Sequence, residues 1–487
     1  MKKKYVRWTL WTIASPFILF VILCILIYLP PIQNFLVDKA AVYASEATGM
    51  NISVGRISLS FPLNLVVTDV DAASPHNDTL LSVRRLQVNV QLLPLLKKQV
   101  EVDGISLQGA TVNSNDLIHG MKLNGTLGEL FISSHGVALD PETAIVNKVL
   151  LKDTDLSLCL NDTAAADTAA SDTAYWKIIL QDIDLQNVSF ALDMPLDSLS
   201  LAASLDNAIL RDGLIDLHKS AYSLQTFRIE NGRVRYDNGK PLAADSLSSG
   251  LDPSHIALTD IGVKLDSLYY GGRNMKAIIS QFVLKERSGV EIVSATGRMV
   301  SNDKVLRVPS LKLETRDSYL ELNAAMDWNA LDFKDEGLVS ARLMADIGKP
   351  DVVRFMGSMD EKFIRQYPSE PLRIRTGIDG DLNKLKLTTL TAELPGALGL
   401  FARGELTHLT DSLLRGGDIT LEAETKDLKF VSTLAEGIEI PYGTRLEGKF
   451  TMAGTKMGTD LLLMQPEAQA VVAADTIPIT AVSYTHL

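Results

Sequence analysis

The sequence predicts a mainly β protein, in which an N-terminal transmembrane helix precedes an antiparallel sheet of repeated amphipathic strands and a few short helices. Three observations carry this prediction. Apolar and polar residues alternate with period two along most of residues 50–487, which is typical of half-buried strands. Residues 8–37 contain no charged side chain, and only two later stretches show helical spacing. A sheet of this kind has one apolar face, which the fold has to cover or use.

The first 30 residues predict a membrane anchor. A basic tail, residues 1–7, carries three lysines and one arginine, and an apolar run over residues 8–30 follows it. About 20 apolar residues cross the hydrocarbon core of a bilayer, and the basic cluster stays on the cytoplasmic side. A cleaved signal peptide has the same order of features, but this run is long and no small-x-small cleavage site follows it. We therefore expect a retained anchor, a cytoplasmic N-terminus and an exported body.

Three further segments depart from the strand pattern. Residues 31–49 space their apolar side chains as a helix does and end in a glycine, which predicts a short juxtamembrane helix. Residues 352–366 and, more briefly, 427–437 also have helical spacing. The segment NDTAAADTAASDTA at 161–174 is small, polar and of low complexity, so we expect a solvated insertion within one continuous sheet.

A repeated pattern occurs among the strands. The segments 105–113, 149–157, 183–191 and 227–235 share apolar residues at their first, third and eighth positions and Gly, Asp or Asn at the fifth. We interpret each as a hairpin-like unit, because FRIENGRVRYD at 227–237 has Asn-Gly between two alternating runs, as a two-residue hairpin turn does. The positions expected to line one apolar face are Ile105, Leu107, Val112, Val149, Leu151, Leu156, Ile183, Leu185, Phe190, Phe227, Ile229 and Val234.

Such one-sided strands leave two arrangements open. With few helices, the sheet has to curl, either into a sandwich with a filled core or into a trough whose apolar side stays open to a ligand. Aromatic residues make up 6% of the chain and hydrophobic residues 46%, so the interior is mostly aliphatic in both arrangements. A trough would suit acyl chains, because each buried methylene contributes about 0.8 kcal/mol.

Charge and cysteine content narrow the classes of partner. The chain has 47 Lys and Arg against 59 Asp and Glu, a formal net charge of -12, which disfavours binding to the phosphate backbone of nucleic acids. One of the two cysteines, Cys24, lies in the apolar run, and Cys159 stands alone beyond it. We therefore expect neither an internal disulfide nor a cysteine metal site.

No enzyme motif occurs in the sequence. The seven histidines are scattered, and we interpret them as surface residues. A nucleophile elbow, a phosphate-binding loop and a dinucleotide fingerprint are all absent from the sequence. The Asp-x-Asp pairs at 69–71, 153–155 and 182–184 are interpreted as turn residues rather than calcium ligands. The expectation is a protein without catalytic residues, cofactor or metal.

Two stretches resemble the start of the AsmA-like superfamily, most closely its TamB-like members (translocation and assembly module proteins). They are TGMNISVGRISLSFPLNLVVTDV at 48–70 and LLSVRRLQVNVQLLPLLKKQVEVDGISLQGATVN at 80–113, which includes the Pro94-Leu95-Leu96 triplet. The stretch KLTTLTAELPGALGLFARGEL at 386–406 is similar to the repeated strands of that family. The resemblance covers residues 1–130 well and the remainder diffusely.

The resemblance implies an inner-membrane anchored periplasmic protein with an elongated, taco-like groove. Its implied function is a lipid conduit for outer-membrane biogenesis, which carries phospholipid acyl chains between membranes. The alternative is an assembly factor for outer-membrane β-barrel proteins or autotransporters, a role in protein secretion that uses a TamA-type barrel partner; a passive adhesin or scaffold is a third possibility. Family members continue further and end in a distinct domain, so we expect that the chain is truncated after ITAVSYTHL.

One short motif points to a modification. An Asp-Thr-Ala triplet occurs three times within residues 161–174 and resembles the acceptor of a periplasmic O-glycosylation system of Gram-negative bacteria. The same dipeptides also favour turns, and the sequence does not separate the two interpretations. The candidate acceptors are Thr163, Thr168 and Thr173.

Overall fold

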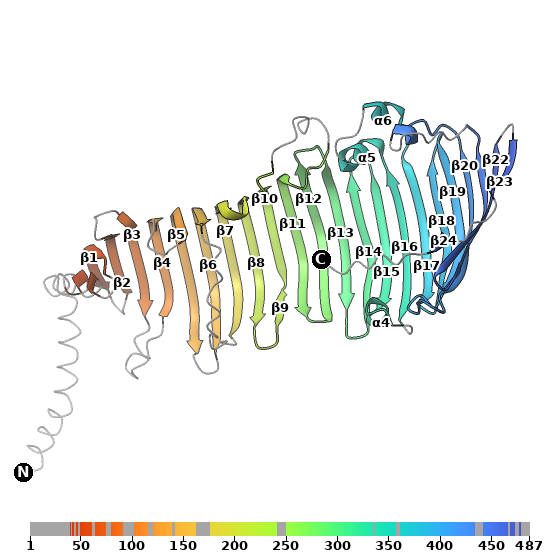
Figure 1. Ribbon diagram of the computed structural model, residues 1–487. Coiled ribbons are helices and arrows are strands. Elements are labelled where there is room, and N and C mark those ends of the chain that lie inside the picture. Colours follow the sequence, from red (N-terminus) through yellow and green to blue (C-terminus); the bar gives the residue numbers. More distant parts are fainter. Residues whose placement is uncertain are drawn as a thin grey trace, which may run out of the picture. The chain divides into compact units, whose positions relative to one another are not determined.

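A computed structural model gives the fold of the chain (Figure 1). The chain divides into two compact units: unit 1 comprises residues 1–218 and 236–239, and unit 2 comprises residues 219–235 and 240–487. Both units are mainly β, which confirms the main part of the predicted fold class. The structure describes residues 39, 41–42, 45–46, 49–60, 64–74, 79–90, 102–114, 120–138, 142–161, 176–240, 250–334, 337–356, 361–433, 442–465, 468–472 and 477–478.

Unit 1 is a ladder of long strands in which each strand pairs with the next. The ladder is antiparallel from β1 to β6 and between β7 and β8. A single turn of 3-10 helix, η1 (Pro195–Asp197), joins β7 to β8. The strands are β1 (Asn51–Ser60), β2 (Asn64–Ala73), β3 (Thr79–Val90), β4 (Val102–Asn113), β5 (Met121–Ala138), β6 (Thr143–Leu160), β7 (Lys177–Met194) and β8 (Leu199–Asp216).

The pairing of β6 with β7 is parallel, which differs from the predicted all-antiparallel sheet. Thr143 is the partner of Lys177 and Cys159 that of Asp193, so both strands run the same way along their whole length. A parallel pair needs a connection of a dozen or more residues, because the chain has to return to the starting end of the first strand. Residues 161–176 provide this connection, and the predicted insertion lies within them.

Unit 2 is also a ladder of strands, most of which pair antiparallel with the next. From β11 to β23 each strand pairs antiparallel with the next, and β9 pairs with β11. The strands are β9 (Ala221–Leu224), β10 (Thr226–Asp237), β11 (His255–Gly271), β12 (Asn274–Glu286), β13 (Glu291–Ser301), β14 (Val305–Thr315), β15 (Tyr319–Asp327), β16 (Leu338–Ile347), β17 (Leu372–Asp381), β18 (Lys384–Leu394), β19 (Leu398–Thr407), β20 (Gly416–Thr425), β21 (Arg445–Ala453), β22 (Lys456–Gln465), β23 (Ala468–Val472) and β24 (Ile477–Pro478).

Short helices lie at the ends of the unit 2 strands (Figure 1). The predicted helix at 352–366 is present as two helices, α5 (Lys349–Met356) and α6 (Glu361–Gln366). Of the predicted helix at 427–437, the described part contains one 3-10 turn, η2 (Val431–Thr433). Helix α4 (Trp328–Leu331), at the opposite end of the strands, was not predicted, because four residues are too few for a helical period.

The two predicted helical segments meet in one buried cluster. Phe363 of α6 packs against Tyr367 and Phe430, with ring centroids 5.5 and 5.8 Å away. The carboxylate of Asp351 on α5 accepts a hydrogen bond of 2.6 Å from the hydroxyl of Ser318, which ties the helix to the β14–β15 turn. These contacts cover one end of the unit 2 strands.

The N-terminal predictions fall largely on residues outside the described set. The basic tail, the apolar run 8–30 and most of the juxtamembrane segment lie there, and so do Thr163, Thr168 and Thr173. Described positions within 39–46 are helical, and Gly49 has a φ of 71° and donates its N–H to the Ser45 carbonyl at 2.9 Å, as a glycine does just past a helix end. None of the helices among the described residues has the length and apolar character needed to cross a bilayer.

The interpretation of FRIENGRVRYD as a hairpin is wrong. The whole segment lies within the single strand β10, and the other three repeats lie within β4, β6 and β7. The fifth residue of every repeat has a left-handed backbone: φ is 62° at Gly109, 48° at Asp153, 51° at Asn187 and 54° at Asn231. The repeat is therefore one strand with an internal irregularity, and the chain does not reverse there.

Candidate functional site

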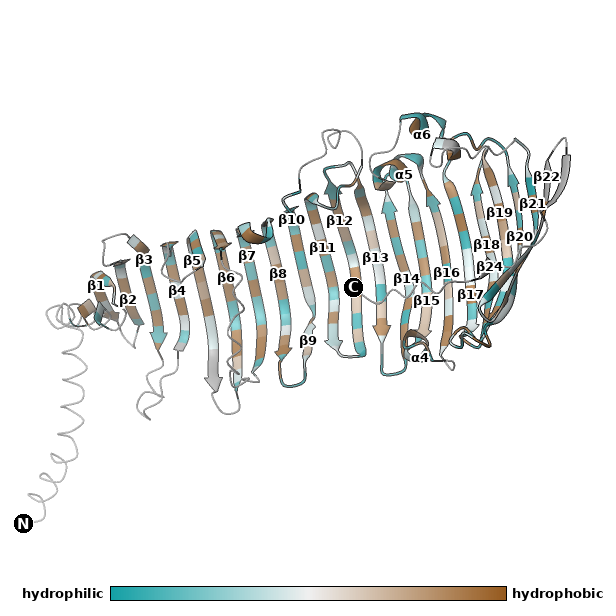
Figure 2. Ribbon diagram, viewed as in Figure 1, coloured by the Kyte–Doolittle hydropathy of each residue, from teal (hydrophilic) through white to brown (hydrophobic). Residues whose placement is uncertain are grey.

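One face of unit 1 carries rows of aliphatic side chains that run across the strands. Neighbours in a row are register partners on adjacent strands, about 4.8 Å apart. The register from β2 to β8 joins Leu65, Val88, Ile105, Ile132, Val149, Ile183 and Leu210 into one unbroken row. We call this side the aliphatic face of unit 1. Figure 2 shows the corresponding alternation of hydrophobic and hydrophilic residues along the strands.

The register brings nine of the twelve predicted lining residues together in three rows. Val149 and Ile183, Leu151 and Leu185, and Leu156 and Phe190 are direct partners in the parallel β6–β7 pair. Each pair connects through β5 to the equivalent residue of β4, which places Ile105, Leu107 and Val112 in the same three rows. The other three predicted residues, Phe227, Ile229 and Val234, lie on β10 with the same spacing.

The sequence interpretation missed a fourth row and the whole contribution of β5. Ala110, Leu127, Val188 and Leu205 form the missed row together with Thr154. On β5, Leu130 and Ile132 complete the first two rows, and a Cβ added to Gly125 would meet Leu156 Cδ2 at 2.8 Å, so this glycine leaves room for a lining residue. The sequence of β5 does contain an apolar pattern, which is interrupted at Gly128. Because β5 is antiparallel to β4 and β6, its apolar positions occur in the reverse order to those of the repeats.

The left-handed residue at the fifth position shifts the alternation by one residue. Apolar residues therefore occupy odd positions before it, the first and third, and an even position after it, the eighth. On β6, Leu151 is half-buried, Lys152 and Asp153 are both exposed, and Thr154 is buried. Two successive residues thus face the polar side, and the alternation resumes one position later. The ladder registers skip Gly109, Asp153 and Asn187 but keep the same pairing on both sides of them. These irregularities align across neighbouring strands.

Within the described part of unit 1, no second layer covers the aliphatic face. The elements that contact each other extensively are neighbours in the ladder. Both clusters of buried hydrophobic residues found among the described residues belong to unit 2. Ile105 is 37% exposed and Phe190 is 38% exposed, which is unusual for large apolar side chains set in continuous rows. Smaller residues of the same rows, Ala110, Thr154 and Ala208, are buried, so the exposed part of the face consists of some of its larger side chains.

Polar side chains of the same strands pair with each other across the ladder. Arg211 forms ion pairs with Asp182 and, at 3.1 Å, with Asp184. The hydroxyl of Ser189 donates a hydrogen bond of 2.8 Å to Asp155. The interpretation of these Asp-x-Asp pairs as turn residues is wrong, because all six lie inside strands: Asp69, Asp71, Asp153, Asp155, Asp182 and Asp184. Their side chains make the opposite face of unit 1 a hydrated, charged surface.

Unit 2 carries an aliphatic face of its own. One row across β15 to β20 joins Leu320, Ala345, Ile374, Ala392, Leu400 and Ala423, in which large and small residues alternate. Its two buried clusters involve α4, α6, η2 and the turns at the strand ends. The core of unit 2 therefore lies at its strand ends.

Comparison of the chain with models of known protein families and with curated proteins finds no match. The family resemblance therefore depends on the residues quoted above.

Among the described residues, no cluster of three or more His, Cys, Asp or Glu side chains could hold a metal ion. One histidine prediction is wrong: His255 is buried, and its Nδ1 lies 2.7 Å from the carboxylate of Asp252. This hydrogen bond lowers the pKa of Asp252, and it joins two residues of one turn. Cys159 is a free thiol.

Proposed function

We propose that the chain is a membrane-anchored lipid conduit, which carries phospholipid acyl chains along its aliphatic face. The observation that carries this proposal is the aliphatic row that runs unbroken across β2 to β8, together with the three rows beside it. Six strand spacings give the rows a length of roughly 29 Å. Binding of a hydrocarbon chain to this surface would contribute about 25 cal/mol of favourable free energy for each Å² of apolar area that leaves water, so a long hydrocarbon ligand is favoured.

The aligned left-handed residues support a concave shape for this face. At each of them two consecutive side chains occupy the polar side and none occupies the apolar side. An irregularity of this kind bends a strand, and the bend is toward the side with fewer residues. Aligned bends in neighbouring strands would fold unit 1 into a trough with the aliphatic rows inside, in keeping with the taco-like groove of the AsmA-like superfamily.

The location follows from the same proposal. The apolar run 8–30 would anchor the chain in the inner membrane with its N-terminus in the cytoplasm, and the strands would lie in the periplasm. The process served would be outer-membrane biogenesis. Function would then reside in the continuity of the lining, and no catalytic residue is required.

An assembly role for outer-membrane β-barrel proteins is the second candidate. Within the described residues β2 is the one strand that pairs with β1, so an incoming strand could add to the other edge of β1 if it displaced the Ser45 hydroxyl, which accepts a hydrogen bond of 3.0 Å from the Ile52 N–H. This role would need a barrel partner of the TamA type.

Purification of the full chain in a mild detergent, followed by lipid extraction and mass spectrometry, tests both candidates. The conduit predicts co-purified phospholipid in a fixed ratio, displaced by added fatty acid. A stoichiometric barrel protein without bound phospholipid would instead support the assembly role. Detergent-purified protein that carries neither would leave only a scaffold.

A further inference from the structure

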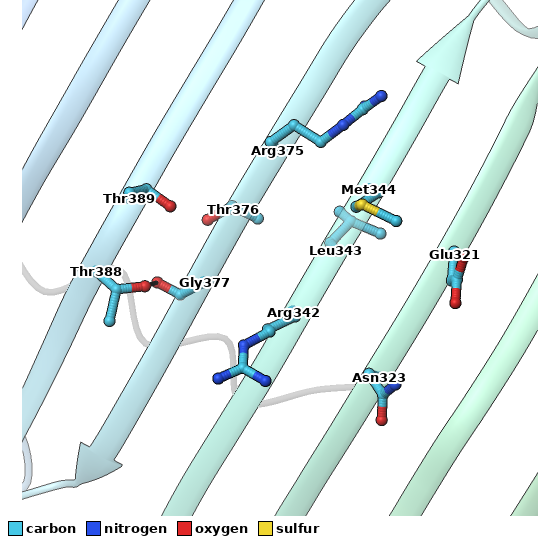
Figure 3. Close-up of a pocket in the computed structure, with 10 residues that line it drawn as sticks. All are labelled: Glu321, Asn323, Arg342, Leu343, Met344, Arg375, Thr376, Gly377, Thr388 and Thr389. Atoms are coloured by element: carbon cyan, nitrogen blue, oxygen red, sulfur yellow. Dashed lines mark hydrogen bonds between the residues drawn. The ribbon is translucent and has the colours of Figure 1, made fainter.

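A small hollow lies over strands β15 to β18, on the side of unit 2 that carries Glu321, Asn323 and Arg342 (Figure 3). Its volume is about 280 Å³, several times the roughly 30 Å³ that one water occupies in the liquid. The lining includes Glu321 and Asn323 from β15, Arg342 from β16, and Thr388 and Thr389 from β18. It is separate from the aliphatic face and does not depend on the proposed function.

The hollow exists because Gly377 leaves a gap in a row of polar side chains. Asn323, Arg342, Gly377 and Thr389 are register partners across four consecutive strands. Thr388 is an extra residue in β18, and its hydroxyl donates a hydrogen bond of 2.9 Å to the Gly377 carbonyl. A Cβ on Gly377 would meet Thr388 Oγ1 at 2.6 Å, so a larger residue would fill the gap.

Most charged groups around the hollow are already paired. Glu321 accepts a hydrogen bond of 2.8 Å from the Tyr319 hydroxyl. Arg375 is held 2.7 Å from Asp346 and donates a hydrogen bond to the Ala345 carbonyl. Both groups are therefore committed to neighbours within the sheet.

Four polar side chains of the lining have no such partner among the described residues, and three of them, all except Thr376, lie in the row that contains Gly377. Within the described residues, the guanidinium of Arg342, the amide of Asn323 and the hydroxyl of Thr389 make neither a hydrogen bond nor an ion pair. Figure 3 shows Arg342 extending from β16 toward the side of β17, where Gly377 has no side chain. All three groups can donate hydrogen bonds, and one of them carries a permanent positive charge.

We propose that this hollow binds a phosphate group, held by Arg342 with help from Asn323 and Thr389. A guanidinium donates two parallel hydrogen bonds to phosphate oxygens, and the neutral donors on either side would complete the contacts. The phosphate would be either a free ion or the headgroup of a glycerophospholipid, because both present the same oxygens.

The test uses the full chain in detergent and isothermal titration at constant ionic strength, with inorganic phosphate and sn-glycerol 3-phosphate as probes. Saturable binding of either supports the site. Binding of glycerol phosphate at least tenfold tighter than inorganic phosphate assigns it to a headgroup, and similar affinities assign it to free phosphate. Failure of both probes to saturate the protein overturns the proposal, whatever the outcome of the lipid extraction.

Two variants and a matched control locate the binding. Arg342→Gln is expected to weaken phosphate binding at least tenfold. Arg373→Gln removes the same charge from β17, at an arginine exposed to solvent and 3.7 Å from Glu393, and should leave binding unchanged. Equal losses in both variants would show general charge attraction and overturn the proposal. The double variant Gly377→Ala with Thr388→Ala fills the gap without the 2.6 Å contact, and should also lose binding at an unchanged melting temperature.

Discussion

The side-chain amide of Asn187 on β7 donates a hydrogen bond of 2.9 Å to the carboxylate of Asp153 on β6. Both residues have a left-handed backbone, with φ of 51° and 48°. The parallel β6–β7 pair places two repeats side by side in the same direction, so their irregular residues coincide. Asn and Asp tolerate this conformation better than most residues and can hydrogen bond locally. The pair therefore stabilises the position at which the polar and apolar faces change phase.

Replacement of Asn187 should reveal how strongly this position depends on backbone conformation. Asn187→Val should lower the free energy of unfolding by about 2 kcal/mol, because a β-branched residue is disfavoured at positive φ and the hydrogen bond is lost. Asn187→Gly should cost less, since glycine adopts this conformation freely. The difference in free energy of unfolding between the two variants is measured in the full chain, by hydrogen exchange at β6 and β7 as a function of urea concentration. The control is Gln186→Val, at the neighbouring exposed position; equal effects of both valines would contradict the prediction.

A charge placed within the aliphatic rows should block lipid binding. Leu185 lies in the second row between Leu151 and Ala208, so Leu185→Asp would put a carboxylate against hydrocarbon, which is costly without a partner. Co-purified phospholipid should fall at least fivefold, while circular dichroism stays unchanged because this face is not packed against a second layer. Ile229→Asp on β10 tests the predicted lining position in unit 2 in the same way.

Gln186→Asp is the matched control for the charged variants. It introduces the same charge one residue away, on the polar face, and should retain the bound lipid. If Leu185→Asp lost solubility together with lipid, the aliphatic face would be a packed core and the conduit proposal would fail.

The sequence predicted the strand content because it depends on local alternation. Leu151 and Leu185 could be assigned to one face from their own neighbours, and the register confirms that they are partners. The shared residue at the fifth repeat position was also visible. The structural role of this residue could not be predicted, because Asn-Gly occurs both in hairpin turns and at left-handed positions within strands.

Features that depend on distant residues could not be predicted. The Asn231-Gly232 position stays within β10, although its local sequence favours a turn. The parallel direction of β7 relative to β6 is set by the path of the connection, which composition does not encode. The hollow over Gly377 needs residues from four strands, and only the register shows that Asn323, Arg342 and Thr389 share one row.

The aromatic cluster at one end of unit 2 should contribute to local stability without affecting lipid binding. Phe430 packs against Phe363 and, at 5.2 Å between ring centroids, against Tyr367. Phe430→Ala should cost about 3 kcal/mol through lost burial and the cavity it leaves. Hydrogen exchange should accelerate in α6 and in the β18–β19 turn, while bound phospholipid stays unchanged. Loss of lipid in this variant would show that the end of the sheet takes part in binding.

Acid should loosen the turn before β11, because two carboxylates there are stabilised in their charged form. The hydrogen bond with His255 is the main cause of the lowered pKa of Asp252, with a further contribution from the Ser254 N–H at 2.9 Å. Burial of Glu286 opposes its ionisation, but N–H groups of Ala257 and Ser288 and the Ser288 hydroxyl outweigh it and lower the pKa.

The direction of the pH effect follows from these lowered pKa values. Near pH 4 the unfolded chain binds more protons than the folded one, so stability rises with pH through this range. The contribution of these two carboxylates to stability is complete above their pKa values in the unfolded chain, about 4. It is lost as the pH falls through their lower pKa values in the folded chain. Asp252→Asn should therefore flatten the stability profile below pH 5, as measured by hydrogen exchange of the Ala257 amide between pH 3 and 6. Asp260→Asn, an exposed neighbour on β11, serves as the control; a profile equally flattened by this control would assign the acid response to overall charge.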